Sequence, residues 1–467
     1  SNIGSEDLIG LAGAGASSGM AMAHWEIQGW MILILGWVFV PFYTRSMVYT
    51  MPEFLERRYN PQSRTILSVI SLVSYVLTKV AVTVYAGGLV FQQVFGIKEL
   101  WGIDFFWIAA IGLVVLTALY TIFGGMKSVL YTSVLQTPIL LLGSLIILVL
   151  GFKELGGWDE MMRVCGAVTV NDYGDTMTNL IRSNDDANFP WLGALIGSAI
   201  IGFWYWCTDQ FIVQRVLSGK NEMEARRGTI FGAYLKLLPV FLFLIPGMIA
   251  FALHQKYIGA GGEGFLPMLA NGTANADAAF PTLVAKLLPA GVKGLVVCGI
   301  LAALMSSLAS LFNSSAMLFT IDFYKRFKPE TPEKKLVGIG QIATIVIVVL
   351  GILWIPIMRS VGDVLYTYLQ DVQSVLAPGI AAAFLLGICW KRTSAQGGMW
   401  GLISGMVIGL TRLGAKVYYS NAGEVADSTF KYLFYDMNWL FFCGWMFLFC
   451  IIAVSYTHLT LPTKLEV

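Results

Sequence analysis

The sequence predicts an all-α protein that crosses a membrane many times, and three observations carry this prediction. Of its 467 residues, 57% are hydrophobic and only 12% are charged. Apolar runs such as residues 135–151 and 339–358 approach the roughly 20 helical residues that cross a bilayer core. Lysine and arginine also collect in alternate connections between these runs, as they do in polytopic membrane proteins.

Hydropathy divides the chain into about twelve predicted spans. They cover residues 1–23, 27–43, 65–96, 103–122, 127–151, 191–217, 228–252, 294–319, 336–358, 364–390, 397–418 and 439–454. The basic connections, such as those around Arg57, Arg226 and Lys334, alternate with acidic or nearly uncharged ones. Because positively charged loops stay in the cytoplasm, the first span is predicted to run outward.

Both ends of the chain are expected to depart from the native protein. Residue 1 is a serine, and polar residues open what should be the middle of a helix, so the first span is expected to be incomplete. The tail, residues 456–467, has neither a helical period nor the character of an anchor, which makes it a candidate for a foreign sequence.

Missing motifs disfavour several other classes of protein. There is no GxxxxGK phosphate-binding loop, and no segment outside the predicted spans is long enough for a nucleotide-binding domain. The three histidines are scattered, the six cysteines form no CxxC pair, and no TVGYG-like ion filter occurs. A net charge of +2 says little about partners, and we predict neither an enzyme nor a nucleic-acid partner. Transport would have to draw on an ion gradient.

Small and polar residues dominate the first span, SNIGSEDLIGLAGAGASSG. Tight packing of a small-residue helix explains residues 10–19 but not Asn2 and Asp7. Free backbone carbonyls at bilayer depth are tolerated only around a cavity or an ion. We therefore predict a broken helix that lines a site.

Hydroxyl groups crowd the span ILAALMSSLASLFNSS, residues 300–315. Ser306, Ser307, Ser310, Asn313 and Ser314 include helical spacings that place several of them on one face. One interpretation is that each hydroxyl bonds a carbonyl of its own helix. The other is that hydroxyl and carbonyl oxygens, which are hard ligands, bind an alkali cation. The sequence leaves both open.

Isolated charges and amides form a further group within the spans. Lys79 and Lys236 lie in mid-span and should face a wet cavity or a carboxylate. Glu26 belongs either to the same site or to the membrane interface. Gln370 and Gln373 lie one turn apart on a later span.

Aromatic residues crowd the stretch GFWYWCTDQFIVQR, residues 202–215, beside an aspartate. An ionisable group at membrane depth is costly, so the stretch predicts a functional site. Amides, carboxylates and ammonium groups from several spans, with aromatic rings beside them, suit a neutral polyhydroxylated ligand. An amino acid would also fit, with its carboxylate at a half-helix terminus.

Several stretches of the chain resemble the solute:sodium symporter family and, within it, the sodium/glucose cotransporters. The matching text is SNIGS with GLAGAGASSG, YTMPEFLERRY, WYWCTDQFIVQR, YLKLLP with PGM, AFPTLVAKLLPAGVKGL, ALMSSLASLFNSS followed by FTIDFYKR, and AAAFLLGICWKR. The stretches occur in family order from residue 1 to about residue 392. Each alone is a weak signal, whereas the ordered set is specific.

The resemblance implies a LeuT-type fold, with two inverted repeats of five helices in which spans one and six are broken. Residues 1–151 would form the first repeat, 152–190 an extracellular loop and 191–391 the second repeat. Residues 392–455 would add two peripheral spans. The unwound part of span six is expected within residues 202–210, facing the substrate.

The resemblance also implies a sodium site. Its ligands would be the carbonyl groups of Ile3 and Ala303 and the hydroxyl groups of Ser306 and Ser307, with one more carbonyl from upstream of this chain. The family commonly has an aspartate where this chain has Ser133, near a second sodium position in some members. The resemblance therefore favours one sodium ion, although the serine could also be a neutral change in packing.

A sugar site follows from the same resemblance. Its residues would be Asn2, Asp7, Glu26, Lys79, Gly202, Tyr205, Trp206, Lys236, Gln370 and Gln373. Tyr205 corresponds to the aromatic residue that stacks on the sugar and blocks its inward exit. Asp209 and Gln210 would lie further toward the cytoplasm, as inner-gate or structural groups.

Three pocket positions depart from the family pattern. Asp7 stands where relatives often have His or Gln, Gly202 where they have Asn or Thr, and Gln373 where Thr is common. The preference of the pocket among hydroxylated solutes is therefore open.

The function implied by the resemblance is sodium-coupled import of a neutral, glucose- or galactose-like sugar across the cell membrane by alternating access, with one Na⁺ per sugar. Sodium would join span one to span eight and favour the outward-open state. Alternatives with the same fold are myo-inositol, sialic acid, proline or a small anion as the solute, an uncoupled uniporter, and a sensor that does not transport. The oligomeric state is not predicted.

Overall fold

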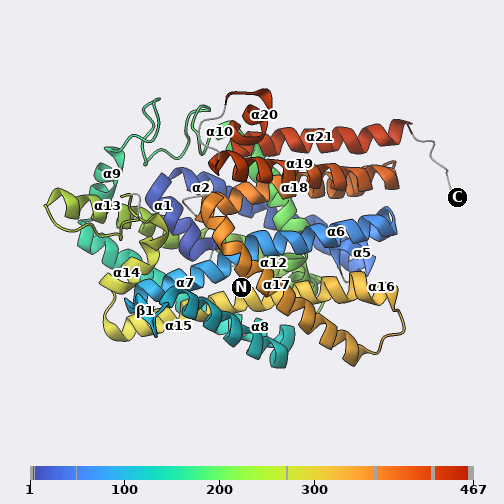
Figure 1. Cartoon of the computed structure of the whole chain (residues 1–467), viewed down its shortest axis with the longest axis horizontal. Helices are drawn as coiled ribbons and strands as arrows, with labels where there is room; N and C mark the ends of the chain where they lie inside the picture. The colour runs from blue at the N-terminus through green and yellow to red at the C-terminus, as the bar shows by residue number, and fades with distance from the viewer. Residues whose placement is uncertain are drawn as a thin grey trace.

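The computed structural model of the chain describes residues 4, 6–48, 50–269, 272–361, 365–421 and 426–460, and it is almost entirely helical. Figure 1 shows the long helices running roughly along the long axis of the molecule, with β1 and α9 toward one end and α16 toward the other. Asn2 and Ile3 of the predicted sites, and the end of the tail, lie outside the described residues.

The first half of the chain consists of short helical segments joined end to end, followed by a small hairpin and one long helix. The segments are η1 (Glu6–Leu11), α1 (Ala12–Ser18), α2 (Ala21–Trp25), η2 (Glu26–Trp30), α3 (Met31–Ile34), η3 (Leu35–Phe39), α4 (Val40–Ser46), α5 (Met51–Arg58), α6 (Pro61–Ser74), η4 (Tyr75–Val80) and α7 (Ala81–Phe95). The hairpin and the helices after it are β1 (Glu99–Leu100), β2 (Ile103–Asp104), α8 (Phe105–Leu155) and α9 (Trp158–Gly166).

The second half repeats the pattern of interrupted helices and ends in longer ones. The interrupted part comprises α10 (Trp191–Gly202), η5 (Phe203–Thr208), α11 (Gln210–Leu217), α12 (Glu222–Leu235), η6 (Val240–Leu244), α13 (Ile245–Gly259), η7 (Ala276–Ala278) and α14 (Ala279–Leu287). The later part comprises α15 (Ala290–Met317), η8 (Leu318–Tyr324), α16 (Lys325–Phe327), α17 (Glu333–Val361), α18 (Leu365–Cys389), α19 (Ala395–Asn421), α20 (Thr429–Lys431), η9 (Tyr432–Asp436) and α21 (Trp439–Thr460).

The multi-pass architecture is confirmed, but the number of clear spans is smaller than expected. Within the described residues, eight helices are long and apolar enough to cross a membrane, or nine if the bent pair formed by Thr429–Asp436 and Trp439–Ser455 counts as one span. Phe105–Leu119 is apolar but short. Helix α19 is long enough, but Arg412 and Lys416 interrupt its apolar run.

Helix α8 covers two of the predicted spans. A straight helix of this length would measure about 77 Å, more than twice the thickness of a bilayer core. Instead, Phe105 at its start contacts Phe95, and the carbonyl of Leu155 at its end accepts a hydrogen bond from Lys256. The neighbouring elements β1 and α9 lie toward the same end of the molecule (Figure 1). The chain of α8 thus crosses the molecule and returns.

Glycines bring the first span into backbone contact with the seventh. A Cβ atom at Gly15 would overlap the carbonyl oxygen of Leu244, and one at Gly247 would overlap the carbonyl oxygen of Ala12. One glycine lies on each span, so each helix lacks a side chain where the backbone of the other approaches it. The predicted small-residue packing of residues 10–19 is confirmed.

The first span ends at Gly19, which has a φ of 73°, in the left-handed region that glycine tolerates. A Cβ atom here would overlap the carbonyl of Met177 in the connection after α9. The same carbonyl accepts a hydrogen bond of 2.7 Å from the Met20 N–H. Arg182, from the same connection, donates to the carbonyl of Ser18. The connection therefore caps the outer end of the span.

Candidate transport site

Several residues of the predicted sugar site lie where a helix widens. Asp7 belongs to η1, Lys79 to η4, and Tyr205 and Trp206 to η5, and all three segments are π-helical. Glu26 begins the tighter 3₁₀ segment η2. Wide turns of this kind are rare and occur preferentially at functional positions. The change in helix geometry therefore coincides with the polar residues selected from the sequence.

Lys236 lies between two carboxylates at the end of α12. Its Nζ is 3.0 Å from Asp7 Oδ1 and 3.0 Å from Glu26 Oε2. Asp7 is 2% exposed and Glu26 is 6% exposed, so the cluster is buried. The prediction that Lys236 faces a carboxylate is confirmed, and Glu26 belongs to this cluster and not to the membrane interface.

Lys79 has a different partner, the aspartate that follows the aromatic stretch. Its ammonium group forms an ion pair with Asp209 Oδ2. The other oxygen, Oδ1, accepts hydrogen bonds of 2.8 Å from the Tyr75 hydroxyl and 3.1 Å from the Phe211 N–H. The Tyr205 ring centroid lies 4.7 Å from Lys79 Nζ. Lys79 also faces a carboxylate, as predicted, but its charge is directed to Asp209.

Span six is broken within residues 202–210, as expected, but the aromatic stretch before the break is helical and not unwound. The π-helix η5 continues through Thr208, and the chain becomes extended only at Asp209, where φ is −77° and ψ is 126°. Gly202 lies against span two, because a Cβ atom there would be 3.0 Å from Gln28 Cβ and 3.1 Å from Met31 Cγ. Its small size thus permits close packing of the two spans.

Three buried polar atoms in this region have no hydrogen-bond partner among the described residues. They are Asp7 Oδ2, Trp206 Nε1 and Gln370 Oε1. Gln370 and the buried Gln373 lie on α18, which packs against both η1 and η5. Buried polar groups are almost always paired, so such a cluster indicates a place where a ligand or water completes the bonds.

A cavity of about 210 Å³ reaches Asp7 and Trp206 but not Gln370. Lys236 also lines it, and it extends to Arg215 and Thr229, on either side of a basic connection. Ligand pockets for small molecules usually measure about 300–1,000 Å³. The volume of this cavity is therefore below that of a usual ligand pocket. The cavity extends toward the side predicted to be cytoplasmic.

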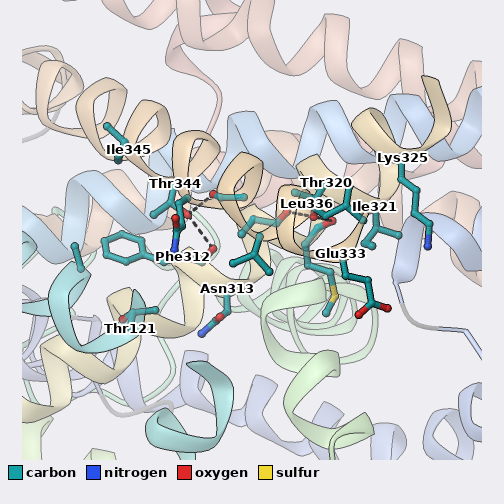
Figure 2. Close-up of a pocket in the computed structure, with 16 residues that line it drawn as sticks. Thr121, Phe312, Asn313, Thr320, Ile321, Lys325, Glu333, Leu336, Thr344 and Ile345 are labelled. Carbon is teal, nitrogen blue, oxygen red and sulfur yellow. Dashed lines mark hydrogen bonds between the residues drawn. The ribbon is translucent and has the colours of Figure 1, made fainter. Parts of the chain in front are cut away.

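A larger cavity, of about 550 Å³, lies between α15, η8 and α17, and Figure 2 shows the residues that line it. None of the described residues of the predicted sugar or sodium sites is among them. Size therefore does not identify the transport site. The smaller cavity differs from the larger one by the buried charged and unpartnered groups in its lining.

The serine-rich face of α15 combines both interpretations that the sequence left open. The hydroxyls of Ser310 and Ser314 donate to the carbonyls of Ser306 and Ser310, each at 2.9 Å. The Asn313 amide donates to the carbonyl of Ala309 at 3.0 Å. For Ser310 and Asn313 these bonds are internal to the helix, as in ordinary packing, whereas Ser314 Oγ also accepts a hydrogen bond from Gln214 Nε2 of α11.

Ser306 and Ser307 differ from the serines below them. Ser306 Oγ lies 2.7 Å from Ser133 Oγ on α8. A Cβ atom at Gly4 would lie 2.6 Å from Ser307 Oγ, so the start of the first span touches this hydroxyl. Ala303, the other described residue of the predicted sodium site, is buried one turn earlier on α15. The arrangement brings one hydroxyl of span eight next to the backbone of span one and another next to a hydroxyl of span five.

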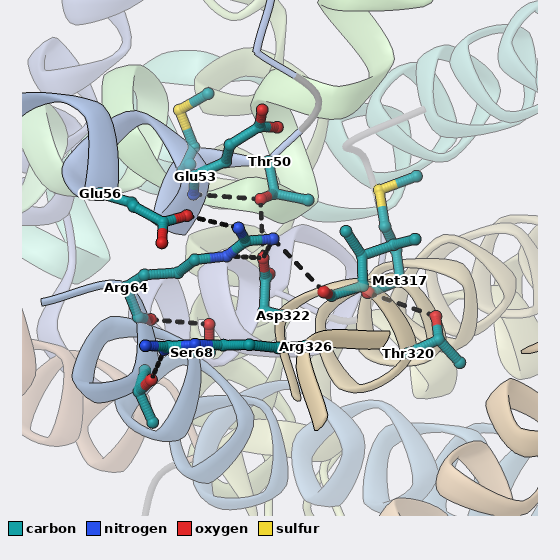
Figure 3. A network of polar contacts seen from close by, with 12 residues as sticks. Thr50, Glu53, Glu56, Arg64, Ser68, Met317, Thr320, Asp322 and Arg326 are labelled. Atoms are coloured by element: carbon teal, nitrogen blue, oxygen red, sulfur yellow. Dashed lines mark hydrogen bonds and ion pairs between the residues drawn. The ribbon is translucent and has the colours of Figure 1, made fainter. Parts of the chain in front are cut away.

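A further ionic network lies at the end of the molecule that carries α16, and sequence reasoning missed it. Figure 3 shows Arg64 of α6 between Asp322 of η8, at 2.6 Å, and Glu56 of α5, at 2.5 Å. Nearby, Gln210 Oε1 accepts a hydrogen bond of 2.8 Å from the Met51 N–H. Gln210 thus ties the inner half of span six to the first residue of α5. A lone aspartate at the end of an apolar span was the available signal.

Asp371 is a second charged residue whose role the sequence did not indicate. It follows Gln370 on α18, and its Oδ2 lies 2.6 Å from Lys416 Nζ of α19. Arg412 lies one turn before Lys416 on α19 and is fully buried. It lies 3.6 Å from Asp371 Oδ1 and donates to the carbonyl of Met437 at 2.7 Å. These contacts fasten α18 to the peripheral helices. Two basic residues within a long apolar helix were the signal.

Sequence comparison identifies the family. The profile of the Sodium:solute symporter family matches residues 1–405. The chain belongs to this family. Among curated relatives of this family member, the human sodium/myo-inositol cotransporter 2 is 38% identical over 426 residues, which is 88% of this chain and 62% of the relative. The mouse sodium/glucose cotransporter 4 is 37% identical over 482 residues, which is 99% of this chain and 68% of the relative.

Solved structures support the expected fold of this family member. A Na⁺-coupled sialic acid symporter in an outward-open state matches 98% of this chain and 88% of its own, with a TM-score of 0.71 at 20% identity. Mhp1, a nucleobase-cation-symport-1 family transporter, matches 99% of this chain and 91% of its own, with a TM-score of 0.52 at 15% identity. The LeuT-type fold is confirmed.

Proposed function

We propose that this family member imports a neutral polyhydroxylated solute, a sugar or a cyclitol, together with sodium ions across the cell membrane. The observation that carries the proposal is the set of unpartnered buried atoms on η1, η5 and the neighbouring helix α18. Asp7 Oδ2 and Gln370 Oε1 accept hydrogen bonds, and Trp206 Nε1 donates one. Each hydroxyl of a polyol can both donate and accept, so its hydroxyls suit atoms of either kind.

Lys236 and the aromatic residues complete the proposed solute site. Lys236 holds Asp7 and Glu26 in place through its two contacts of 3.0 Å, which orients both carboxylates toward hydroxyl donors. The Tyr205 ring lies against the Lys79–Asp209 pair. We propose that it covers the ring face of the solute and closes the narrow inner cavity beneath it. Asn2 and Gln373 belong to the same proposed site, and Gly202 acts there by letting spans two and six approach.

The proposed sodium site lies between the first span and α15. Its ligands would be the carbonyls of Ile3 and Ala303 and the hydroxyls of Ser306 and Ser307. The contact of Gly4 with Ser307 supports this position, since it brings the backbone of the first span to the hydroxyl. Because Ser133 is neutral and bonds Ser306, no second cation is proposed there, and we expect one sodium ion per solute.

Sodium at this position would couple the two fluxes by joining the first span, which carries Asp7, to α15. Coupling requires that sodium bind the solute-competent state more tightly than the other state. A membrane potential of about 100 mV supplies roughly 2.3 kcal/mol per charge, and a tenfold sodium gradient about 1.4 kcal/mol more. One ion per solute could therefore sustain an accumulation of several hundredfold.

Two kinds of polyol fit the proposal, because the curated relatives named above are a sodium/myo-inositol and a sodium/glucose cotransporter at nearly equal identity. Sialic acid and small anions fit less well, since Lys236, Asp7 and Glu26 together carry one positive and two negative charges. The chain spans 62% of the length of the inositol relative, so these assignments apply to the protein that contains it.

Uptake by the protein reconstituted in liposomes tests the proposal. Labelled galactose, glucose and myo-inositol are offered with either sodium or potassium outside. We expect sodium-dependent accumulation of at least one of them, lost in Ser307→Ala and kept in the matched control Ser310→Ala, whose hydroxyl bonds only its own helix. Equal uptake in potassium would overturn the coupling and leave a uniporter. Absence of uptake with all three would overturn the solute class.

A further inference from the structure

The larger cavity is a groove along the outside of the helix bundle, separate from the transport site. One wall is formed by α15, η8 and the start of α16 from Phe312 to Lys325, another by α17 from Glu333 to Ile345, and Ala118 and Thr121 of α8 line the third side. We call it the α15–α17 groove. Twelve residues of α helix measure about 18 Å, so the groove extends about as deep as one leaflet of a bilayer core of roughly 30 Å.

The groove opens toward lipid. Helix α17 belongs to the apolar span Glu333–Pro356, only 33% of which is buried inside the protein. Val337 and Ile345 at the rim of the groove are 62% and 60% exposed. Exposed apolar side chains on a membrane-spanning helix face hydrocarbon, so an acyl chain can enter the groove from the side.

Most uncharged polar side chains along the groove bond carbonyls of their own helices. The Thr320 hydroxyl donates to the carbonyl of Ala316 at 2.5 Å, and the Thr344 hydroxyl donates to the carbonyl of Gly340 at 3.0 Å. The Asn313 amide donates to the carbonyl of Ala309, and the Thr121 hydroxyl to that of Thr117. Apart from Gln341 and the charged residues Lys325 and Glu333, the other lining residues are apolar (Figure 2). Such a surface suits hydrocarbon, not a sugar.

The mouth of the groove is basic. Lys325 lines it, and the same connection carries Arg326, Lys328, Lys334 and Lys335 against Glu330 and Glu333. This connection is one of those predicted to be cytoplasmic. Clusters of basic residues beside membrane spans on that side bind the headgroups of anionic lipids.

We propose that the α15–α17 groove binds an anionic phospholipid of the inner leaflet, with one acyl chain between the helices and its phosphate beside Lys325. Glu333 also lines the mouth, and a headgroup with hydroxyls can donate to it, so phosphatidylglycerol fits better than a phosphate alone. Lipid binding at this site does not require the proposed transport function. The groove begins at Phe312, later in α15 than Ser306 and Ser307, so a bound lipid would contact the helix that carries the proposed sodium ligands.

Native mass spectrometry of the protein released from nanodiscs tests this site. The nanodiscs contain equal amounts of phosphatidylglycerol and phosphatidylcholine with identical chains. We expect the wild type to retain phosphatidylglycerol about threefold or more over phosphatidylcholine. Lys325→Gln should abolish that preference, and Val337→Trp should reduce retention of both lipids by obstructing the groove.

Two matched controls separate the groove from general effects. Lys391→Gln removes an exposed charge from another connection predicted to be cytoplasmic, and Ile342→Trp adds an indole to α17 at a position that is 63% exposed and does not line the groove. Both should retain lipid like the wild type. Equal retention of the two lipids by the wild type, or equal losses in a variant and its control, would overturn the proposal. So would displacement of the lipid by millimolar glycerol phosphate, since the chain would then contribute nothing.

Discussion

Two buried lysines lie in mid-span, and the structure uses them differently. Lys79 faces a single carboxylate, Asp209, of which both oxygens have partners. Lys236 faces two carboxylates, and Asp7 Oδ2 has no partner among the described residues. We call the first arrangement closed, because both oxygens of Asp209 are bonded. In the second, Asp7 Oδ2 can still accept a hydrogen bond.

This difference distinguishes an ion pair that joins two helices from a cluster that can bind a solute. A buried ion pair with every atom bonded gains nothing from a ligand, so the Lys79–Asp209 pair fastens η4 to the break in span six. The Lys236 cluster can gain hydrogen bonds when a solute arrives. The sequence presents both residues as lone lysines in apolar spans, and only their partners distinguish them.

Removing Lys79 should have the largest effect on stability. Lys79→Met leaves Asp209 buried without its cation, and breaking a buried pair costs about 3–5 kcal/mol. We expect a clear fall in the melting temperature measured by tryptophan fluorescence, partly restored in Lys79→Met combined with Asp209→Asn. The control is Arg163→Gln, which breaks an exposed pair with Glu160. A fall no larger than that of the control would contradict the closed arrangement.

Asp7→Asn should act on the solute more than on stability. Glu26 still pairs with Lys236, so the melting temperature should change little. A hydrogen bond from a solute hydroxyl to a charged group contributes about 1.5–3 kcal/mol, so the solute KM should rise tenfold or more. Transport kinetics in proteoliposomes measure this, with the sodium dependence as the internal control. A melting temperature that fell as far as in Lys79→Met would show that the two clusters have the same role.

Tyr75→Phe tests one hydroxyl of the closed pair. It removes the hydroxyl that donates to Asp209 Oδ1 and accepts from the Phe211 N–H, while that N–H keeps its own bond to Asp209 Oδ1. We expect a loss of about 1 kcal/mol in the free energy of unfolding. The solute KM should stay within twofold of wild type, and a larger shift would place Tyr75 in recognition.

Gln370→Met should have the smallest effect on stability and is the sharpest test. It replaces a buried amide whose Oε1 lacks a partner by an apolar side chain of similar size. Removing an unsatisfied polar group is neutral or stabilising, so the melting temperature should stay constant or rise. The solute KM should rise severalfold. Loss of stability would mean that the amide oxygen is bonded within the protein.

The sequence predicted the helical class and most spans, because hydropathy is a local property. It did not predict that α8 would cover two spans or that Arg412 and Lys416 would interrupt the apolar run of α19. For the site, it identified Lys236, Asp7 and Glu26 as members but not as partners, since no spacing rule links positions so far apart in the chain. The serines of α15 illustrate another limit. Side-chain rotamers decide whether a hydroxyl turns to its own helix, as in Ser310, or to a neighbour, as in Ser306.

The two glycines at which the first and seventh spans touch fix the position of these helices relative to each other. With Gly15 against Leu244 and Gly247 against Ala12, neither backbone can slide by a residue without a collision. Whatever conformations the protein visits, these two helices must travel as one body. A pair of spin labels placed on them should report a constant distance in every state, against which the displacement of any other helix can be calibrated.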